Sequence, residues 1–253
     1  MVAPVKKYVG IKNYVDIIKD KDTIQIVVNT LLYIFILVII NFVVPYILSF
    51  VNTFVMKRGK SIYKSLLFIP SLISLVVGAI ALQWIFNPIS GPISGFLSEF
   101  GISMPTWSKT KGLVIFVISL VAVLKSFGYN FLVLLSGMGS VSEELIEAAR
   151  LEKTPDRTIF RKVVMPLTSS TAIYVLIISI VQGMQYVFTP IKVLTQGGPN
   201  NASSNIIYGV YQEAFGFYNT GKASALSIMT MFIFLVLLFL EFKYVERGVY
   251  YEN

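Results

Sequence analysis

Residues 26–50, IVVNTLLYIFILVIINFVVPYILSF, form a nearly unbroken run of apolar side chains. The hydrocarbon core of a bilayer is about 30 Å thick, and a helix needs about 20 apolar residues to cross it. The run is therefore long enough to span a membrane. It is also too long, and begins too late in the chain, for a cleavable signal peptide.

Four further runs have a similar composition and lie at 66–86, 112–135, 169–188 and 223–240. Only 13% of the residues are charged and the mean hydropathy is +0.75, whereas a soluble domain carries about 25% charged residues. The sequence predicts an all-α fold, a polytopic membrane bundle with five spans and a single transmembrane domain over residues 1–253. Pro45 and Pro70 fall inside spans, where neighbouring groups or water must bond to the carbonyl that each proline frees.

The chain contains neither cysteine nor histidine. This composition excludes disulfides, thiolate or imidazole metal sites and a Ser-His-Asp triad. We therefore predict no catalytic residue and no metal site. The formal net charge of +8 suits basic residues placed at the ends of membrane spans.

The distribution of these basic residues indicates an orientation. Eleven lysines and arginines follow the first, third and fifth spans, and four follow the second and fourth. Because cytoplasmic loops are enriched in such residues, residues 137–168 are predicted to be cytoplasmic and 189–222 extracytoplasmic. An odd number of spans then leaves the N-terminus outside, although it carries Lys6, Lys7, Lys12, Lys19 and Lys21. This conflict suggests that a preceding span is missing from this chain.

The predicted cytoplasmic loop is unusually polar between two apolar runs. Ser140 and Glu143 fit a capping box that begins a first helix, and Thr154-Pro155 fits the N-cap and N1 of a second. The first helix is expected to present one small apolar face, made of Leu145, Ala148, Ala149 and Leu151. The second is expected to carry an amphipathic stripe, made of Ile159, Phe160, Val163, Val164 and Leu167.

Two interpretations of this loop are open. An amphipathic helix can lie on the bilayer surface, which suits the second helix. The acids of the first helix, Glu143, Glu144 and Glu147, would be repelled by an anionic leaflet. An acidic helix with small side chains is better suited to docking on a protein partner.

Residues 147–166, EAARLEKTPDRTIFRKVVMP, resemble the EAA loop of permease subunits of binding-protein-dependent ABC importers. The chain keeps the family residues Glu147, Ala148, Ala149, Phe160 and Pro166. It differs at two positions, with Glu152 where the family usually has Asp and Lys153 where it has Gly. Either Lys153 adopts a left-handed conformation at a cost of about 1 kcal/mol, or the turn is built differently around Thr154-Pro155.

Other segments are similar to the carbohydrate branch of this family, the maltose-type permeases. They are VLTQGGPNN at 193–201, YVGIKNYVDIIKD at 8–20 and FNPISGPIS at 86–94. The resemblance implies a type I importer permease fold with a core of six spans, the first of which is absent here. It also implies contact with the binding protein at Gly197, Gly198 and Pro199.

The resemblance further implies a multi-pass subunit in the cytoplasmic membrane of a prokaryote, without enzymatic activity, cofactor or nucleic-acid partner of its own. Its partners would be a second permease subunit, two ATPase subunits that hold ATP and Mg, an extracytoplasmic solute-binding protein, membrane lipid and a sugar. ATPase coupling would fall to Glu147, Ala148, Ala149, Glu152, Lys153, Phe160 and Pro166. Glu147 would pair with a basic group on the ATPase while Ala148 and Ala149 fill its groove.

In maltose-type permeases the sugar lies between the helices that match the third and fourth spans here. The corresponding polar and small residues are Lys125, Ser126, Tyr129, Asn130, Gln182, Gly183, Met184, Gln185 and Tyr186. Hydroxyl, amide and aromatic groups suit a sugar, but Asn and Gln also hold membrane helices together. Lys125 marks either an acidic substrate or a bond to backbone carbonyls.

Three alternatives compete with the importer. A stand-alone secondary transporter or channel would need ion-coupling carboxylates, yet the five spans contain neither Asp nor Glu and only Glu241 borders one. A membrane enzyme would need a nucleophile with a base. A nucleotide site of its own would rest on residues 216–223, GFYNTGKA, but Ala223 has no hydroxyl for Mg²⁺ and no buried strand precedes the loop.

Overall fold

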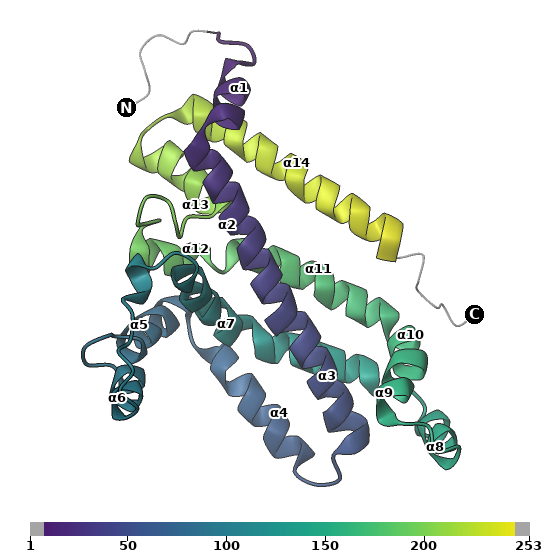
Figure 1. Cartoon of the computed structure of the whole chain (residues 1–253). Coiled ribbons are helices and arrows are strands. Elements are labelled where there is room, and N and C mark those ends of the chain that lie inside the picture. Colours follow the sequence, from purple (N-terminus) through teal and green to yellow (C-terminus); the bar gives the residue numbers. More distant parts are fainter. Residues whose placement is uncertain (1–7, 246–253) are drawn as a thin grey trace. The chain divides into compact units, whose positions relative to one another are not determined.

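The computed structural model describes residues 8–245, apart from the side chains of 240–242, 244 and 245, and these residues form helices and connecting turns without a strand (Figure 1). Lys6, Lys7 and Arg247 lie outside the described residues, and so does the side chain of Glu241. The chain divides into two compact units. Unit 1 takes the described parts of Met1–Ile36, Leu75–Ala122 and Gly183–Val236, and unit 2 those of Leu37–Ser74, Val123–Gln182 and Leu237–Asn253.

Four helical stretches are long and apolar enough to cross a membrane: Lys21–Val55, Leu113–Met138, Ser169–Thr195 and Thr220–Phe239. The first stretch contains α2 (Lys21–Val38) and α3 (Val44–Phe50), each followed by a π-helical turn. The second stretch is α7 (Leu113–Met138), and the third begins with α11 (Ser169–Gln185). The fourth lies within α14 (Thr220–Val245). The shorter helices are α1 (Lys12–Lys19), α4 (Lys60–Phe68), α5 (Leu75–Ile85), α6 (Pro92–Glu99), α8 (Glu143–Leu151), α9 (Asp156–Ile159), α10 (Met165–Leu167), α12 (Phe188–Pro190) and α13 (Ile206–Tyr211).

The run 66–86, predicted as one continuous span, is broken. Lys60–Leu72 and Leu75–Ile85 are inclined by 99° to each other, so that five spans result only if this pair counts as one. A 3₁₀ turn at Ile69–Leu72 carries Pro70 and ends the first half. Proline cannot donate the backbone hydrogen bond that would continue the helix, which explains why the break lies here.

Pro45 is accommodated differently, within the helix of the first span. A proline frees the carbonyl four residues earlier, which here belongs to Asn41. The Asn130 side chain donates its Nδ2–H to this oxygen over 2.9 Å. This confirms the expectation that a neighbouring group must satisfy the carbonyl that Pro45 frees.

The same asparagine belongs to a buried polar network in unit 2. Asn130 Nδ2 also lies 3.1 Å from Ser179 Oγ and 3.2 Å from Gln182 Oε1. Asn41 Nδ2 donates to Ser126 Oγ over 2.6 Å. The network therefore joins the proline-bearing helix to α7 and α11 by side-chain bonds, which fix the relative register of the three segments.

The first half of the broken span packs closely on α7. A Cβ on Gly128 would lie 2.6 Å from the Leu67 carbonyl oxygen, so only glycine allows this approach. Near the break, Lys125 Nζ donates to the Ser71 carbonyl oxygen over 2.9 Å. Lysines favour such carbonyls at helix C-termini. The structure therefore shows the bond to a backbone carbonyl, which was one of the two roles considered for Lys125.

Unit 1 has its own apolar core, formed where the ends of five helices meet. Its buried members come from α1, α2, α11, α13 and α14: Ile17, Ile26, Met184, Ile206, Ala225 and Leu226. In the same unit, Lys222 Nζ lies 3.1 Å from Asp20 Oδ2 and 2.8 Å from Glu213 Oε1. These ion pairs hold the start of α14 against the α1–α2 junction.

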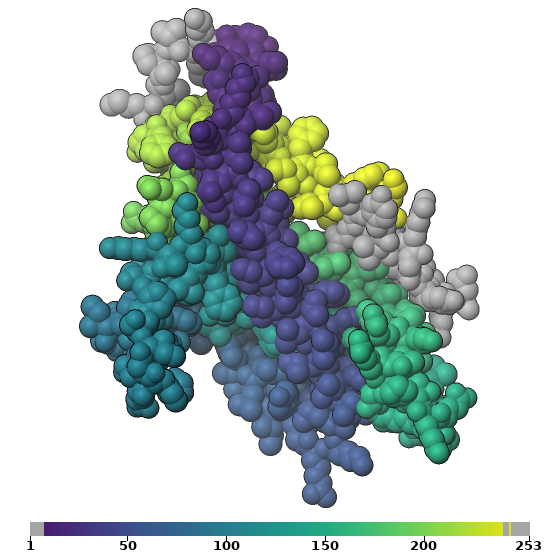
Figure 2. Space-filling model, viewed as in Figure 1, coloured from purple at the N-terminus to yellow at the C-terminus, as the bar shows by residue number. Residues whose placement is uncertain are grey.

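One face of the first span is open to its surroundings, and Figure 2 shows it as a continuous purple-to-blue surface. Large apolar side chains lie on this face at every fourth residue or at multiples of that spacing. Among them are Leu31 and Phe35, which are 52% and 63% exposed. Residues four apart share a helix face. A stripe of this kind is suited to lipid contact.

We predict that Asn130→Ala lowers the free energy of unfolding by about 2 kcal/mol, because it removes the side-chain donor to the buried Asn41 carbonyl. Combining it with Pro45→Ala, which restores a helical N–H to that carbonyl, should make the loss smaller by about 1 kcal/mol. Denaturant unfolding of the four proteins of this double-mutant cycle in detergent measures the coupling. Ser119→Ala is the control, since buried Ser119 bonds only within its own helix to the Ile115 carbonyl. Purely additive losses would contradict the prediction.

Candidate functional site

The loop between the third and fourth spans forms a first helix, α8, and a second helix, in which a π-helical turn joins α9 to α10. Figure 1 shows α8 at the outer end of the loop, beyond α9 and α10. The cap of α8 differs from the prediction. Ser142 is the N-cap, and its Oγ accepts from the Glu144 N–H over 3.2 Å. Ser140 instead donates to the Gly137 carbonyl oxygen, because the helix begins two residues later than a capping box on Ser140 requires.

The predicted small-residue face of α8 is divided between two sides of the helix. Ile146 is 2% exposed and Ala149 packs beside it against the core of unit 2. Ala148 points away from the core and is exposed, as are Leu145 and Leu151. The outward stripe follows the i, i+3, i+4, i+7 spacing of one helix face: Glu144, Glu147, Ala148 and Leu151.

Lys153 occupies the left-handed position after α8, with φ of +58°. The Lys153 N–H donates to the Arg150 carbonyl and the Thr154 N–H to the Ala149 carbonyl. These two bonds form a Schellman motif, in which glycine is the usual residue at the left-handed position. The first of the two turn geometries considered for Lys153 is therefore present.

The second helix packs on the protein itself. α9 begins at Asp156, with Pro155 as N-cap, one residue later than predicted from Thr154-Pro155. Ile159 and Val164 are fully buried in the core of unit 2. The Phe160 ring lies 5.0 Å from the Phe50 ring, so the predicted stripe covers the first span's helix rather than the bilayer surface.

Arg150 forms a second attachment that sequence reasoning missed. Its Nη2 donates to the Phe54 carbonyl oxygen over 2.8 Å and lies 3.1 Å from Asp156 Oδ1. The ion pair is exposed and stabilises little by itself. The bond to a carbonyl at the end of the first span nevertheless fixes α8 in position, and only the tertiary arrangement reveals it.

The predicted pathway residues of unit 2 fall into two groups. Ser126, Asn130 and Gln182 are buried and engaged in the polar network. Tyr129 is 46% exposed, and its hydroxyl lies 3.5 Å from that of Tyr174. Bonds between buried amides hold helices together, whereas the two tyrosine side chains are partly exposed at the surface of unit 2.

Tyr174 also lines a shallow, open cavity of about 690 Å³ between α7 and α11. The seven lining residues carry hydroxyls, small groups and no charge: Val133, Ser136, Gly137, Ser140, Ser170, Thr171 and Tyr174. Two of these residues mark a close approach of the helices, since a Cβ on Gly137 would lie 2.7 Å from Thr171 Oγ1. The serines and threonines of both helices were the available sequence signal, and we did not predict them.

The other predicted pathway residues belong to unit 1. Gly183 is buried, and a Cβ there would lie 3.1 Å from the Ile34 Cα, so it permits close helix packing. Met184 is a core residue. Gln185 is exposed and Tyr186 is half-buried.

The GGP segment of unit 1 is a rigid turn fastened to α2. Gly197 has φ of +84°, and a Cβ there would lie 3.1 Å from the Tyr208 ring. Asn29 Nδ2 donates to the Asn201 carbonyl and Tyr33 OH to the Ser203 carbonyl, both over 2.8 Å. Gly197 is buried and Gly198 half-buried, whereas Pro199 is exposed. The proline therefore offers the surface that a partner can reach.

Lys222, the lysine of the sequence that resembles a phosphate loop, is engaged in the ion pairs with Asp20 and Glu213. Partial burial disfavours the charged form of Asp20, but hydrogen bonds from Lys222, the Asp22 N–H and Thr23 outweigh it and lower the pKa of this carboxyl. The lysine thus serves to join segments of unit 1.

We predict that Lys153→Gly stabilises the protein by about 1 kcal/mol, because glycine adopts the left-handed conformation without the Cβ penalty. The change should raise the thermal midpoint in detergent by about 2–4 °C. Glu152→Gly is the control, since Glu152 has a negative φ of −73° and should gain nothing. An unchanged or lower midpoint for Lys153→Gly would contradict the prediction.

Two curated relatives are similar to nearly the whole chain. The sn-glycerol-3-phosphate transport system permease protein UgpA of Yersinia enterocolitica is 29% identical over 246 residues, which are 97% of this chain and 83% of the relative. The protein of the same name from Escherichia coli O157:H7 is 28% identical over the same shares.

Two solved structures have the same fold. A bacterial ABC transporter involved in the import of the acidic polysaccharide alginate matches with a TM-score of 0.86 at 18% identity, over 96% of this chain and 85% of that chain. A bacterial alginate ABC transporter in complex with an alginate pentasaccharide-bound periplasmic protein matches with a TM-score of 0.82 at 19% identity, over 92% and 82%. These matches confirm the predicted importer permease fold.

A family model described as the inner membrane component of binding-protein-dependent transport systems matches residues 19–249. The match confirms the family inferred from the EAA and GGP segments. This chain belongs to the binding-protein-dependent transport system inner membrane components and is a multi-pass permease subunit.

Proposed function

We propose that this subunit forms half of a translocation pathway for a saccharide or a related polyol. The observation that carries the proposal is the uncharged, hydroxyl-lined cavity between α7 and α11, with the exposed Tyr129 and Tyr174 hydroxyls 3.5 Å apart. Serine and threonine hydroxyls both donate and accept hydrogen bonds, which suits the alternating groups of a sugar. Tyrosine adds an aromatic face on which a sugar ring can stack. The names of the relatives, which concern glycerol phosphate and alginate, agree with a polyhydroxylated cargo.

The second part of the proposal concerns coupling. α8 presents two carboxylates, Glu144 and Glu147, beside the small Ala148 on its outward face. A basic group on an ATPase subunit would pair with Glu147 while Ala148 lets the partner approach. Since α8 is held by Arg150 and its loop by the Phe160 ring, a displacement of the docked helix would be transmitted to the first span.

In the complete importer we place this loop in the cytoplasm and the GGP segment outside, following the distribution of basic residues. ATP and Mg would be held by two ATPase subunits, and a second permease subunit would complete the pathway. Pro199, at the exposed tip of the GGP turn, would meet the solute-binding protein. Support for these partners comes from the family and from the geometry of the two surfaces.

We predict that Ala148→Trp uncouples transport, because the bulky ring occupies the outward face that the partner must approach. Solute uptake should fall roughly tenfold, as expected for a disrupted central contact, while ATP hydrolysis by the assembled importer continues. Ser61→Trp is the control, since Ser61 is exposed on α4 outside the loop. Normal uptake by Ala148→Trp vesicles would refute the docking role.

We also predict that Tyr129→Ala and Tyr174→Ala each reduce uptake of labelled saccharides roughly tenfold, since the sugar loses both a ring contact and a hydroxyl partner. The phenylalanine variants should retain more uptake than the alanine variants if stacking dominates. Neutral and acidic saccharides should be affected alike, because the tyrosines contribute no charge. Tyr63→Ala, an exposed tyrosine of α4, is the control. Equal uptake by all these variants would place the pathway elsewhere.

A further inference from the structure

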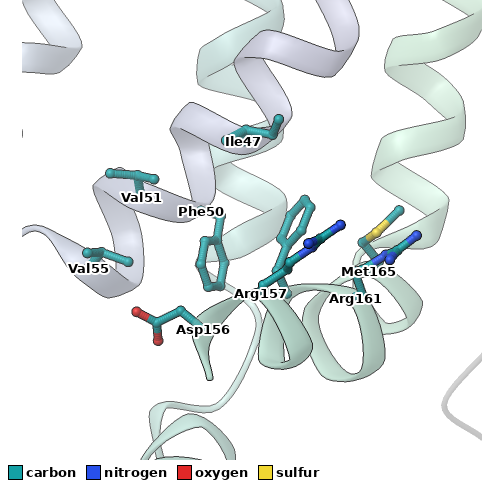
Figure 3. A pocket seen from close by; sticks show the side chains of 9 residues that line it. Ile47, Phe50, Val51, Val55, Asp156, Arg157, Arg161 and Met165 are labelled. Atoms are coloured by element: carbon teal, nitrogen blue, oxygen red, sulfur yellow. The ribbon is translucent and has the colours of Figure 1, made fainter. Parts of the chain in front are cut away.

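We propose a binding site for one anionic phospholipid in a groove between the end of the first span and the second helix of the loop. The groove has a volume of about 510 Å³ and is shown in Figure 3. Its residues all belong to unit 2: Ile47, Phe50, Val51, Val55, Asp156, Arg157, Phe160, Arg161 and Met165. Neither the family nor the proposed coupling role assigns this groove a ligand.

The floor and walls of the groove are apolar. The rings of Phe50 and Phe160 lie 5.0 Å apart and close its inner side. Ile47 and Val55 are 48% and 41% exposed, and Met165 is 39% exposed. These side chains belong to or adjoin a helix apolar enough to cross a membrane, so an acyl chain is the apolar group that can reach them.

Two guanidinium groups border this apolar surface. Arg157 and Arg161 are four residues apart, and Figure 3 shows both on the same side of the groove as Met165. Asp156 also lines the groove, but its carboxylate is paired with Arg150 at 3.1 Å. The four charged groups together leave a net positive charge. Arginine forks match phosphate oxygens in geometry as well as in charge.

The depth of the groove in the membrane favours a lipid over other anions with an apolar part. The span ends at Val55, and Lys57 and Arg58 follow within three residues. The groove therefore lies at the boundary between hydrocarbon and headgroups, on the side where the basic loops gather. A phosphodiester headgroup over the arginines and an acyl chain along Phe50 and Ile47 would satisfy both halves of the groove.

Native mass spectrometry of the purified full chain tests this proposal directly, with dioleoyl-phosphatidylglycerol, dioleoyl-phosphatidylcholine and inorganic phosphate as probes. The wild-type chain should bind phosphatidylglycerol roughly tenfold more tightly than phosphatidylcholine. Arg157→Gln/Arg161→Gln should weaken phosphatidylglycerol binding roughly tenfold. Lys57→Gln/Arg58→Gln removes the same charge outside the groove and should have less than about a twofold effect. Val55→Ser should weaken the binding of both lipids.

Three results would overturn the proposal. Equal losses in the two charge-removing pairs would mean a diffuse surface attraction. Binding of inorganic phosphate as tight as that of phosphatidylglycerol would mean an ion site without a lipid. Loss of the bound lipid when the chain is isolated within its assembled importer would mean that a protein partner fills the groove.

Discussion

The backbone carbonyl of Asn41, which loses its α-helical donor to Pro45, is the constraint on which the arrangement of unit 2 depends. A carbonyl without a partner in hydrocarbon costs several kcal/mol, so a donor must be supplied from another helix. Asn130 supplies it at 2.9 Å and is itself held by Ser179 and Gln182. One proline thus requires one amide on α7, and that amide fixes the register of three helical segments. The positions of the cavity on α7 and α11 and of the loop's anchor on α3 follow from this register.

The loop is held to the membrane helices by contacts of different kinds. Phe160 packs between the rings of Tyr46 and Phe50, with centroids 5.3 and 5.0 Å away. Arg150 bonds to the Phe54 carbonyl, and the Schellman turn at Lys153 closes α8. Apolar packing buries one side of the loop's helices, while the directed bonds determine which side of α8 faces outward. A helix attached in this way transmits displacement instead of absorbing it, as the coupling role proposed for it requires.

How far the sequence predicts this structure depends on whether a property is local. Hydropathy is local, so the apolar runs were identified correctly. The family segments are local motifs and were also identified, as was the need for a donor near Pro45. The 99° break after Pro70 was not, because a proline signals a lost hydrogen bond without specifying whether the helix bends or finds a partner. Ala148 is exposed and Ala149 faces the core, and α8 is capped by Ser142 instead of Ser140. Both features depend on the angle at which α8 meets the core. For Lys125 and Asn130, the polar residue type indicated either a solute or a neighbouring helix, and only the tertiary structure shows the carbonyl to which each side chain donates.

The structure also separates amides from hydroxyls in a way that bears on transport. Buried amides form several directed bonds each, and removing any partner leaves a donor or acceptor unsatisfied, so Asn130 and Gln182 suit contacts that persist. Hydroxyls such as those of Ser136, Thr171 and Tyr174 rotate freely and exchange a protein partner for water or a solute at low cost. A pathway that must admit and release a polar cargo needs the second kind of group on its walls and the first kind behind them. In the proposed function the hydroxyl-lined cavity meets the solute, and the amides of Asn130 and Gln182, which were predicted as pathway residues, hold the helices behind it.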